Sequence, residues 1–258
     1  MATSKTPRKP TLSPTRINAY LDCAMKYRYI YLEKIGRFFF KPRAGLSFGS
    51  TLHQVLQTFH EGGAQQDPAE LVEQVETRWI SAGYNSPEQE HEYREASVGI
   101  VQRYHDVAIE RIETGVVTLF TEKTISTDMG TFKLSGRVDR IDQHPDGTLE
   151  IIDYKSGRMD VTSEEVGASL AMNIYALILA RNYPGMRVRT TIHALRSGAE
   201  ASAEMSSEEL ADFENHIRTI AEEILSRDFE NVEPHRIDYC QYCDFLPKCE
   251  RWFQQMED

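Results

Sequence analysis

Apolar residues along this chain first recur with a helical period. Ser13 and Pro14 occupy the positions of a helix N-cap and of a first helical residue, so a helix is expected to begin there, within residues 12–36. Helical spacing then returns three more times. The further helices are expected over residues 46–61, 68–82 and 87–113. The N-terminal part of the chain is therefore predicted to be helical.

From residue 116 the period of the apolar residues shortens to two, which is the spacing of a half-buried strand. Asp146-Gly147 is a strong turn signal between two such runs, so these runs are expected to pair as a hairpin. The predicted elements are a meander of strands over 116–126, 131–142 and 149–155, then a helix over 163–182, a strand over 187–195 and a helix over 206–227. Alternation of strands and helices after a meander indicates an α/β fold.

The composition is that of a soluble globular protein. The 258 residues are 40% hydrophobic and 27% charged, which suffices for one large domain with a sizeable core. The polar, proline-rich residues 1–11 are expected to form a disordered tail. No apolar run approaches the roughly 18 residues of a membrane span, and the N-terminus lacks the apolar region of a signal peptide. We therefore expect a cytoplasmic protein without a membrane partner.

Charge is distributed unevenly along the chain. A formal charge of −11 argues against a protein that coats nucleic acid indiscriminately. Residues 1–43 nevertheless hold ten Lys and Arg but only two acidic residues, and tyrosines and phenylalanines are interleaved with these cations. Such a mixture suits phosphate contacts and base stacking. It suits equally well an amphipathic helix with a solvated basic face.

Carboxylates occur on the hairpin strands, where apolar residues are expected. If the strands pair about Asp146, Asp139 faces Asp153 and Arg137 faces Lys155. Opposed Cβ atoms lie about 4.5–5.5 Å apart, where two carboxylates repel and raise each other's pKa. Mg²⁺ or Mn²⁺ would remove that penalty and could generate hydroxide and stabilise phosphoryl charge. Lys155 shares the face of Asp153 and could orient water or offset phosphate charge. The alternative is an exposed hairpin with screened charges.

The stretches GRVDRID and EIIDYKSG resemble the PD-(D/E)XK nuclease superfamily, and the fuller pattern is similar to its RecB-like exonuclease branch. The resemblance implies a restriction-endonuclease-like core, with a central mixed sheet flanked by helices, in which Asp139, Asp153 and Lys155 form the catalytic site. It also implies a metal-ligating histidine on an upstream helix, which matches His53 in FGSTLHQVLQ. Without the resemblance, a lone helical histidine is more often structural.

The same branch carries Gln-x-x-x-Tyr on the helix after the lysine strand, and here the match is partial. Tyr175 is present in LAMNIYALIL and joins the candidate catalytic residues, but Ala171 stands where the family has Gln. The resemblance implies that this pair helps to place the lysine and the DNA. The absence of this glutamine is therefore expected to affect the cleavage rate and the geometry of the bound substrate more than the fold. The other interpretation of Tyr175 is a core aromatic residue.

Four cysteines are split between the two ends of the chain. Cys240, Cys243 and Cys249 cluster near the C-terminus, and Cys23 stands in the basic N-terminal region. Disulfides are not expected in a reducing cytosol, so zinc, iron–sulfur ligation and simple burial are open. The one-plus-three layout resembles the iron–sulfur nucleases of this branch, including the CRISPR-associated RecB-like nuclease and the AddB nuclease domain. The resemblance implies a 4Fe–4S cluster that staples the N-terminal helical region to the C-terminus.

Together these features predict a metal-dependent DNA exonuclease that acts on single strands or ends in repair or recombination. The alternatives are a DNA-binding subunit with weak or no cleavage and a CRISPR-adaptation nuclease. No Walker A pattern occurs, so a helicase motor would belong to another chain. We expect a single domain over 12–258, made of a helical cap and DNA-binding region (12–115), a catalytic core (116–230) and a cysteine-cluster segment (231–258). The expected DNA-binding residues are Arg16, Lys26, Tyr27, Arg28 and Arg137.

Overall fold

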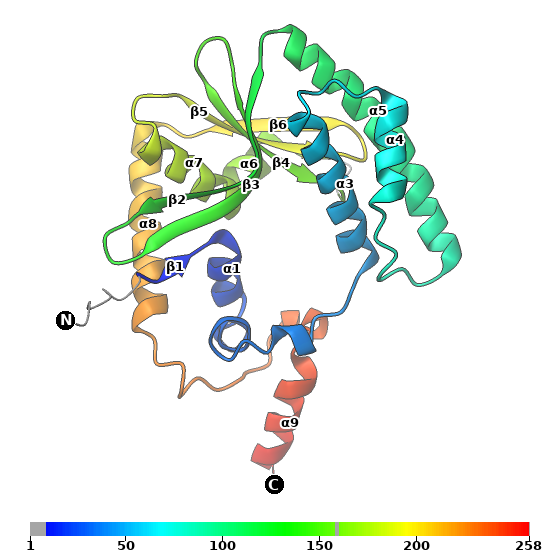
Figure 1. Ribbon diagram of the computed structural model, residues 1–258. Helices are drawn as coiled ribbons and strands as arrows, with labels where there is room; N and C mark the ends of the chain where they lie inside the picture. The colour runs from blue at the N-terminus through cyan, green and yellow to red at the C-terminus, as the bar shows by residue number, and fades with distance from the viewer. Residues whose placement is uncertain (1–8, 158–159, 258) are drawn as a thin grey trace, which may run out of the picture. The chain divides into compact units, whose positions relative to one another are not determined.

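A computed structural model describes residues 9–157 and 160–257, which fall into two compact units (Figure 1). The first unit comprises the described residues up to Lys41, the segment Asp128–Lys133 and the chain from Glu214 onward. The second comprises Pro42–Thr127 and Leu134–Phe213. Each unit thus combines segments that are separated in sequence, unlike the three consecutive parts expected. The single domain expected over residues 12–258 stays a prediction.

The second unit is built on a mixed β-sheet. Its strands are β2 (Val117–Asp128), β3 (Lys133–Gln143), β4 (Leu149–Lys155), β5 (Val188–Ala194) and β6 (Ala199–Glu204). β3, β4, β5 and β6 are neighbours in that order, and β2 pairs with β3. β4 and β5 run parallel, whereas β3–β4 and β5–β6 are antiparallel. The expected meander of β2, β3 and β4 is confirmed.

Helices flank this sheet. Helices α3 (Ala44–Glu61), α4 (Pro68–Thr77) and α5 (Pro87–Glu113) share a buried core with β4 that includes Phe48, Leu52, Phe59, Ile152 and Tyr154. Helices α6 (Ser163–Ala168) and α7 (Leu170–Asn182) form a separate layer, in which α7 packs on β4 and β5 and α6 packs on β5 and β6 (Figure 1). The expected α/β fold with a central mixed sheet and flanking helices is confirmed. Within the described residues, no helix has both the length and the hydropathy needed to cross a bilayer.

Local capping explains where several helices begin. The Asp67 side chain accepts hydrogen bonds from the backbone N–H groups of Ala69 and Glu70, and the Glu70 side chain accepts one from the Asp67 N–H. The Ser86 hydroxyl caps α5 by accepting a hydrogen bond from Gln89 N–H, and a proline follows each cap as the first helical residue. The expected start of α5 is therefore confirmed, whereas α4 ends at Thr77, before the expected residue 82.

The structure differs from the sequence prediction at two places in the C-terminal half. The helix expected over 163–182 is interrupted at Ser169, whose extended backbone (ψ 112°) ends α6 and whose hydroxyl accepts a hydrogen bond from Met172 N–H at the start of α7. Serine favours a cap over a helix interior because its hydroxyl competes for backbone groups. Strand β6 was not expected, because its sequence AEASAE contains no β-branched or aromatic residue.

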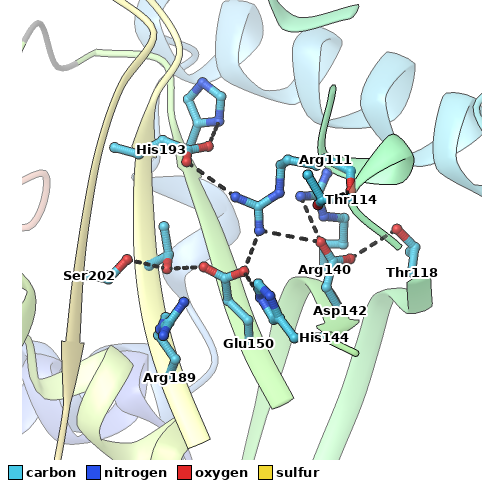
Figure 2. Close-up of polar contacts among 12 residues, drawn as sticks. Arg111, Thr114, Thr118, Arg140, Asp142, His144, Glu150, Arg189, His193 and Ser202 are labelled. Atoms are coloured by element: carbon cyan, nitrogen blue, oxygen red, sulfur yellow. Dashed lines mark hydrogen bonds and ion pairs between the residues drawn. The ribbon is translucent and has the colours of Figure 1, made fainter. Parts of the chain in front are cut away.

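A buried polar network joins α5 to the sheet (Figure 2). Asp142 and Glu150 face each other across β3 and β4, and both are buried. Arg111 of α5 forms an ion pair with Glu150 and lies 3.6 Å from Asp142 and 3.3 Å from Glu200, while Arg140 lies 2.9 Å from Asp142. Because two opposed buried carboxylates would otherwise repel, the arginines permit this pairing of strands.

A second hydrogen-bond chain anchors α3 to β4. Arg140 Nη1 donates to His60 Nε2 and to the Tyr104 hydroxyl, both at 2.6 Å, and the Tyr104 hydroxyl lies 2.5 Å from that of Tyr154. Burial, together with the charges of Arg140 and Arg111, lowers the pKa of His60 to about 2. His60 is therefore a neutral acceptor that fixes α3, and α3 also carries His53.

The first unit contains short helical segments and the cysteines. Its elements are β1 (Thr11–Leu12), α1 (Pro14–Asp22), α2 (Ala24–Tyr27), a π-helical turn (Arg28–Leu32), 3₁₀ turns (Gly36–Phe38 and Asp238–Tyr242), the second part of α8 (Ser207–Ser226) and α9 (Leu246–Glu257). Ser13 accepts from Arg16 N–H, so the expected helix start is confirmed. The helix breaks at Cys23, whose backbone is extended. Met25, Tyr29 and Phe245 form a small buried core.

Candidate active site

The expected register of the central hairpin is confirmed, and it brings the candidate residues to one end of β4. Ile141 pairs with Ile151, the register that sets Asp139 opposite Asp153. Asp139 Oδ2 accepts a hydrogen bond of 2.7 Å from Tyr154 N–H. Such a bond fixes the Asp139 carboxylate beside β4 and leaves its other oxygen available.

Lys155 and Asp153 meet at the end of β4. Lys155 Nζ lies 2.6 Å from Asp153 Oδ2 and forms an ion pair with this buried carboxylate. Burial and the nearby Asp139 charge raise the pKa of Asp153 against the opposing effect of Lys155. A buried carboxylate is costly unless a cation compensates its charge, and here Lys155 supplies a positive charge. Lys155 itself is half-exposed.

His53 comes from α3 and completes the set expected from the sequence. Its Nδ1 lies 3.3 Å from Asp139 Oδ1, and its Nε2 lies 3.1 Å from the Tyr154 carbonyl oxygen. Burial alone would lower the pKa of His53, but hydrogen bonds with Asp139 and Glu122 outweigh burial and raise it to about 10. Donation of Nε2–H to the carbonyl orients Nδ1 toward the carboxylates, as in many metal-binding histidines.

Glu122 of β2 is a further member of the site that the sequence did not reveal. Its Oε1 lies 3.6 Å from His53 Nδ1, and its Oε2 lies 2.6 Å from Arg137 Nε. One atom each from His53, Glu122 and Asp139 lie within 4.8 Å of one another. Glu122 has φ +45°, a strained conformation for this residue type that is typical of functional positions. In the sequence it is one more charge on an exposed strand, so no pattern distinguishes it.

This donor set fits a divalent cation. One imidazole nitrogen and two carboxylates converge, and the Asp153 carboxylate, which pairs with Lys155, lies on the neighbouring strand. Oxygen-rich sites of this kind suit Mg²⁺ or Mn²⁺ better than soft metals. The site opens into a cleft of about 470 Å³ lined by His53, Glu122, Arg137 and Lys155. The cleft therefore combines cation ligands with two positive side chains that could contact an anionic substrate.

Tyr175 of α7 lies near the carboxylates. Burial and the charges of Asp153 and Asp139 raise the pKa of its hydroxyl, so it is protonated at neutral pH. A Cβ atom on Gly136 would clash with the Tyr175 ring, so glycine is required there. Ala171 lies in the first turn of α7. Neither neighbour that could replace the missing glutamine is free, since Asn173 donates to the Gly167 carbonyl at 2.8 Å and Arg137 contacts Glu122.

The other expected DNA-binding residues lie in the first unit, where each has intrachain contacts. Arg16 donates to the Thr11 carbonyl and Lys26 pairs with Asp22 at 2.7 Å. Arg28 pairs with Glu33 and donates to two backbone carbonyls. The Tyr27 ring is buried and stacks on Phe229. A role of these residues in DNA binding stays a prediction, and for Tyr27 it would require this packing to open.

The four cysteines gather in the first unit. Cys23, Cys240, Cys243 and Cys249 line one small cavity, and all are free thiols. Ile237 N–H donates to Cys240 Sγ at 3.4 Å. Burial raises the pKa of the Cys243 and Cys249 thiols, so a metal would have to compensate thiolate charge here. The expected convergence of Cys23 with the C-terminal cysteines is thus found in the structure.

Comparisons with known proteins bear on this geometry. The family model for the PD-(D/E)XK nuclease superfamily matches residues 11–250. An ATP-dependent helicase/deoxyribonuclease subunit of Carboxydothermus hydrogenoformans is 27% identical over 207 residues, which is 67% of this chain but only 18% of that protein. The crystal structure named "Putative exonuclease" from Eubacterium rectale superposes with a TM-score of 0.53 at 13% identity and covers 93% of this chain and 87% of that one. At this identity the superposition shows a shared fold alone.

Proposed function

Because the chain belongs to the PD-(D/E)XK nuclease superfamily, we propose that it is a metal-dependent DNA exonuclease that hydrolyses phosphodiester bonds at single strands or ends. The observation that carries the proposal is a cleft lined by His53, Glu122 and Lys155, with Asp139 beside His53 and Asp153 paired with Lys155. A bound Mg²⁺ or Mn²⁺ would supply Lewis-acid stabilisation and an activated water there. His53, Asp139 and Asp153 would hold the cation, with Glu122 as an additional ligand.

The other residues of the site have separate roles in this proposal. Lys155 lines the cleft, and its ammonium group can donate a hydrogen bond to the attacked phosphate or to the attacking water. Arg137, which is largely exposed beside Glu122, can bind a phosphate of the DNA backbone. Tyr175 remains protonated and can donate a hydrogen bond near Asp153. The Tyr154 backbone fixes Asp139 through its N–H and His53 through its carbonyl.

Digestion of end-labelled linear and circular DNA tests this proposal directly. Wild-type protein is expected to degrade linear DNA with Mg²⁺ or Mn²⁺, but not with chelator, and to spare circles. Asp139→Asn and Asp153→Asn should abolish cleavage, and Lys155→Ala should lower the rate by roughly 10²–10⁴. Asp146→Asn is the matched control, because this exposed turn carboxylate only accepts a hydrogen bond from Thr148 N–H. Normal cleavage by Asp139→Asn would refute the site.

A second candidate function is a DNA-binding subunit with weak or no cleavage. Ala171 favours it, because it stands where the RecB-like pattern has glutamine, and Asn173 and Arg137 are both engaged in other contacts. The digestion assay separates the candidates, since a binding subunit would retain DNA without degrading it. A CRISPR-adaptation nuclease would differ in its partners, and the helicase named in the C. hydrogenoformans relative instead suggests a helicase partner on another chain.

We further propose that Cys23, Cys240, Cys243 and Cys249 bind a 4Fe–4S cluster. All four cysteines line one cavity, which suits ligands to a shared metal centre. Their one-plus-three layout along the chain, which resembles that of the iron–sulfur nucleases, supports a cluster. The N–H donated by Ile237 to Cys240 also suits a thiolate ligand.

A further inference from the structure

A short turn of the first unit exposes two aromatic rings that the proposed catalytic cleft does not use. On the segment Lys34–Lys41, which we call the aromatic turn, Phe38 is 69% exposed and Phe40 is 50% exposed. Phe39, between them, packs on Phe245 at a ring distance of 5.2 Å, and the half-exposed Phe40 ring lies edge-on to Phe245 at 5.6 Å. Exposure of two large rings is unfavourable in water unless a ligand covers them.

The backbone holds these rings in a fixed arrangement. Both Phe39 and Phe40 N–H donate to the Gly36 carbonyl at 2.9 Å, which closes the 3₁₀ turn. A Cβ atom at Gly36 would lie 2.7 Å from the Phe40 ring, so glycine lets this ring fold back over the turn. The packing of Phe39 on Phe245 then anchors the turn to the small core. The exposed rings are therefore preorganised for binding, which lowers the entropy cost of ordering them.

Unpaired cations surround the rings. Lys34, Arg37 and Lys41 are exposed, and in the described chain none of them forms an ion pair with a carboxylate. The Arg37 guanidinium lies 4.7 Å from the centre of the Phe38 ring. The aromatic turn contains no acidic residue, although the chain as a whole carries a formal charge of −11. A polyanion with flat apolar groups complements this surface.

We propose that the aromatic turn binds single-stranded DNA, with bases stacked on Phe38 and Phe40 and phosphates paired with Lys34, Arg37 and Lys41. This proposal rests on the proposed nuclease function. It adds that the protein binds its DNA substrate as an unpaired strand. Bases within a duplex are stacked on each other, so only an unpaired strand offers base faces to the rings. The turn thus selects for strand state and not for sequence.

A binding assay tests this proposal. The affinity of the full chain for labelled oligo-dT and for a duplex of matched length is measured in chelator, so that no cleavage occurs. Phe38→Ala and Phe40→Ala should each weaken oligo-dT binding about tenfold, at the scale of one base stack, and leave the salt dependence unchanged. Phe38→Tyr should bind like wild type. The triple variant Lys34→Ala/Arg37→Ala/Lys41→Ala should reduce the slope of log K against log salt by about 2, since each phosphate contact contributes about 0.7.

Leu21→Ala is the matched control, because Leu21 is an apolar residue of the same unit that is 55% exposed, and this change should leave binding unaltered. If Phe38→Ala and Phe40→Ala bind oligo-dT with wild-type affinity, the proposal is overturned. The exposed rings would then form a docking surface for a protein. An equal loss of duplex binding would overturn the strand preference. Asp139→Asn, assayed in parallel, should keep oligo-dT binding and lose cleavage. The cleavage assay therefore tests the nuclease proposal independently of the test of single-strand binding.

Discussion

At the scale of single residues, Glu122 has two competing partners. It lies within reach of His53 in the proposed metal site and contacts Arg137 at 2.6 Å. Glu122→Gln should weaken Mn²⁺ binding about tenfold or more, because a ligand charge is lost. The same change should strengthen metal-free DNA binding, because Arg137 is released. Titration calorimetry with Mn²⁺ and DNA anisotropy in chelator measure the two effects.

Glu113→Gln provides the control for this prediction, since Glu113 is an exposed carboxylate at the end of α5, outside the cleft. It should change neither measurement. Opposite signs for metal and DNA affinity distinguish a shared carboxylate from general damage to the fold, which would weaken both. Unchanged Mn²⁺ affinity in Glu122→Gln would remove this residue from the proposed ligand set and leave it as a partner of Arg137 alone.

Ala171 is the residue at which the chain departs from the family pattern. It shares a face of α7 with Tyr175, four positions later, and Asn173 and Arg137 are both engaged elsewhere. Ala171→Gln is therefore expected to raise the single-turnover cleavage rate by about five- to thirtyfold, or about 1–2 kcal/mol of barrier. A lower rate would indicate that the site has been repacked around alanine. Ala180→Gln, on the last turns of α7, is the control.

At the scale of secondary-structure elements, the buried ion pairs join α5 to the sheet. Arg111→Met removes the arginine that pairs with the buried Glu150 carboxylate, while Asp142 keeps Arg140, so we expect it to lower the free energy of unfolding by about 3–5 kcal/mol. Arg187→Met removes an exposed partner of Glu204 and should cost about 0–1 kcal/mol. Chemical denaturation of the two variants tests the contrast. Equal losses would contradict a special role of the buried pair.

The sequence predicted the elements whose pattern is local, and missed those decided by tertiary contacts. The hairpin register was predictable because the Asp146-Gly147 turn and the flanking strands fix it. The break at Ser169 and strand β6 were not, because a serine inside an apolar run and an alternation of Ala and Glu carry weak signals. Likewise, sequence motifs predict Asp139, Asp153, Lys155 and His53. Glu122 belongs to no motif, and only its distance to His53 and its positive φ in the folded chain mark it as a site residue.

At the scale of the whole molecule, His60 should make folding sensitive to acid. The unfolded chain binds a proton at this residue below about pH 6.5, the ordinary value for histidine, whereas burial and Arg140 hold the folded pKa near 2. The stability contributed by neutral His60 is therefore present above about pH 6.5 and is lost progressively as the pH falls toward 2. The loss approaches about 1.4 kcal/mol per pH unit.

Urea denaturation at several pH values checks this prediction. His60→Gln should be less stable than wild type at pH 7, but the difference should shrink as the pH falls, because glutamine does not titrate. His91→Gln is the control, since His91 is exposed on α5, and its curve should run parallel to that of wild type. A constant difference between His60→Gln and wild type across this range would show that His60 does not couple folding to protons.

The proposed cluster would act on the same scale, because its ligands join chain segments about 200 residues apart. Closing so long a loop removes entropy from the unfolded chain, so anaerobically purified protein should contain about four irons per chain and lose thermal stability when iron is removed. Cys23→Ser should lose iron and melt at a lower temperature than wild type, and reconstitution with iron and sulfide should not restore its melting temperature. Asp139→Asn, altered only at the proposed cleavage site, should keep both the iron content and the melting temperature of the wild type.

A content of one zinc and no iron per chain would refute the proposed cluster. Full iron in Cys23→Ser would instead exclude Cys23 as a ligand, and the N-terminal segment would then be held by side-chain contacts such as the packing of Met25 and Tyr29 on Phe245.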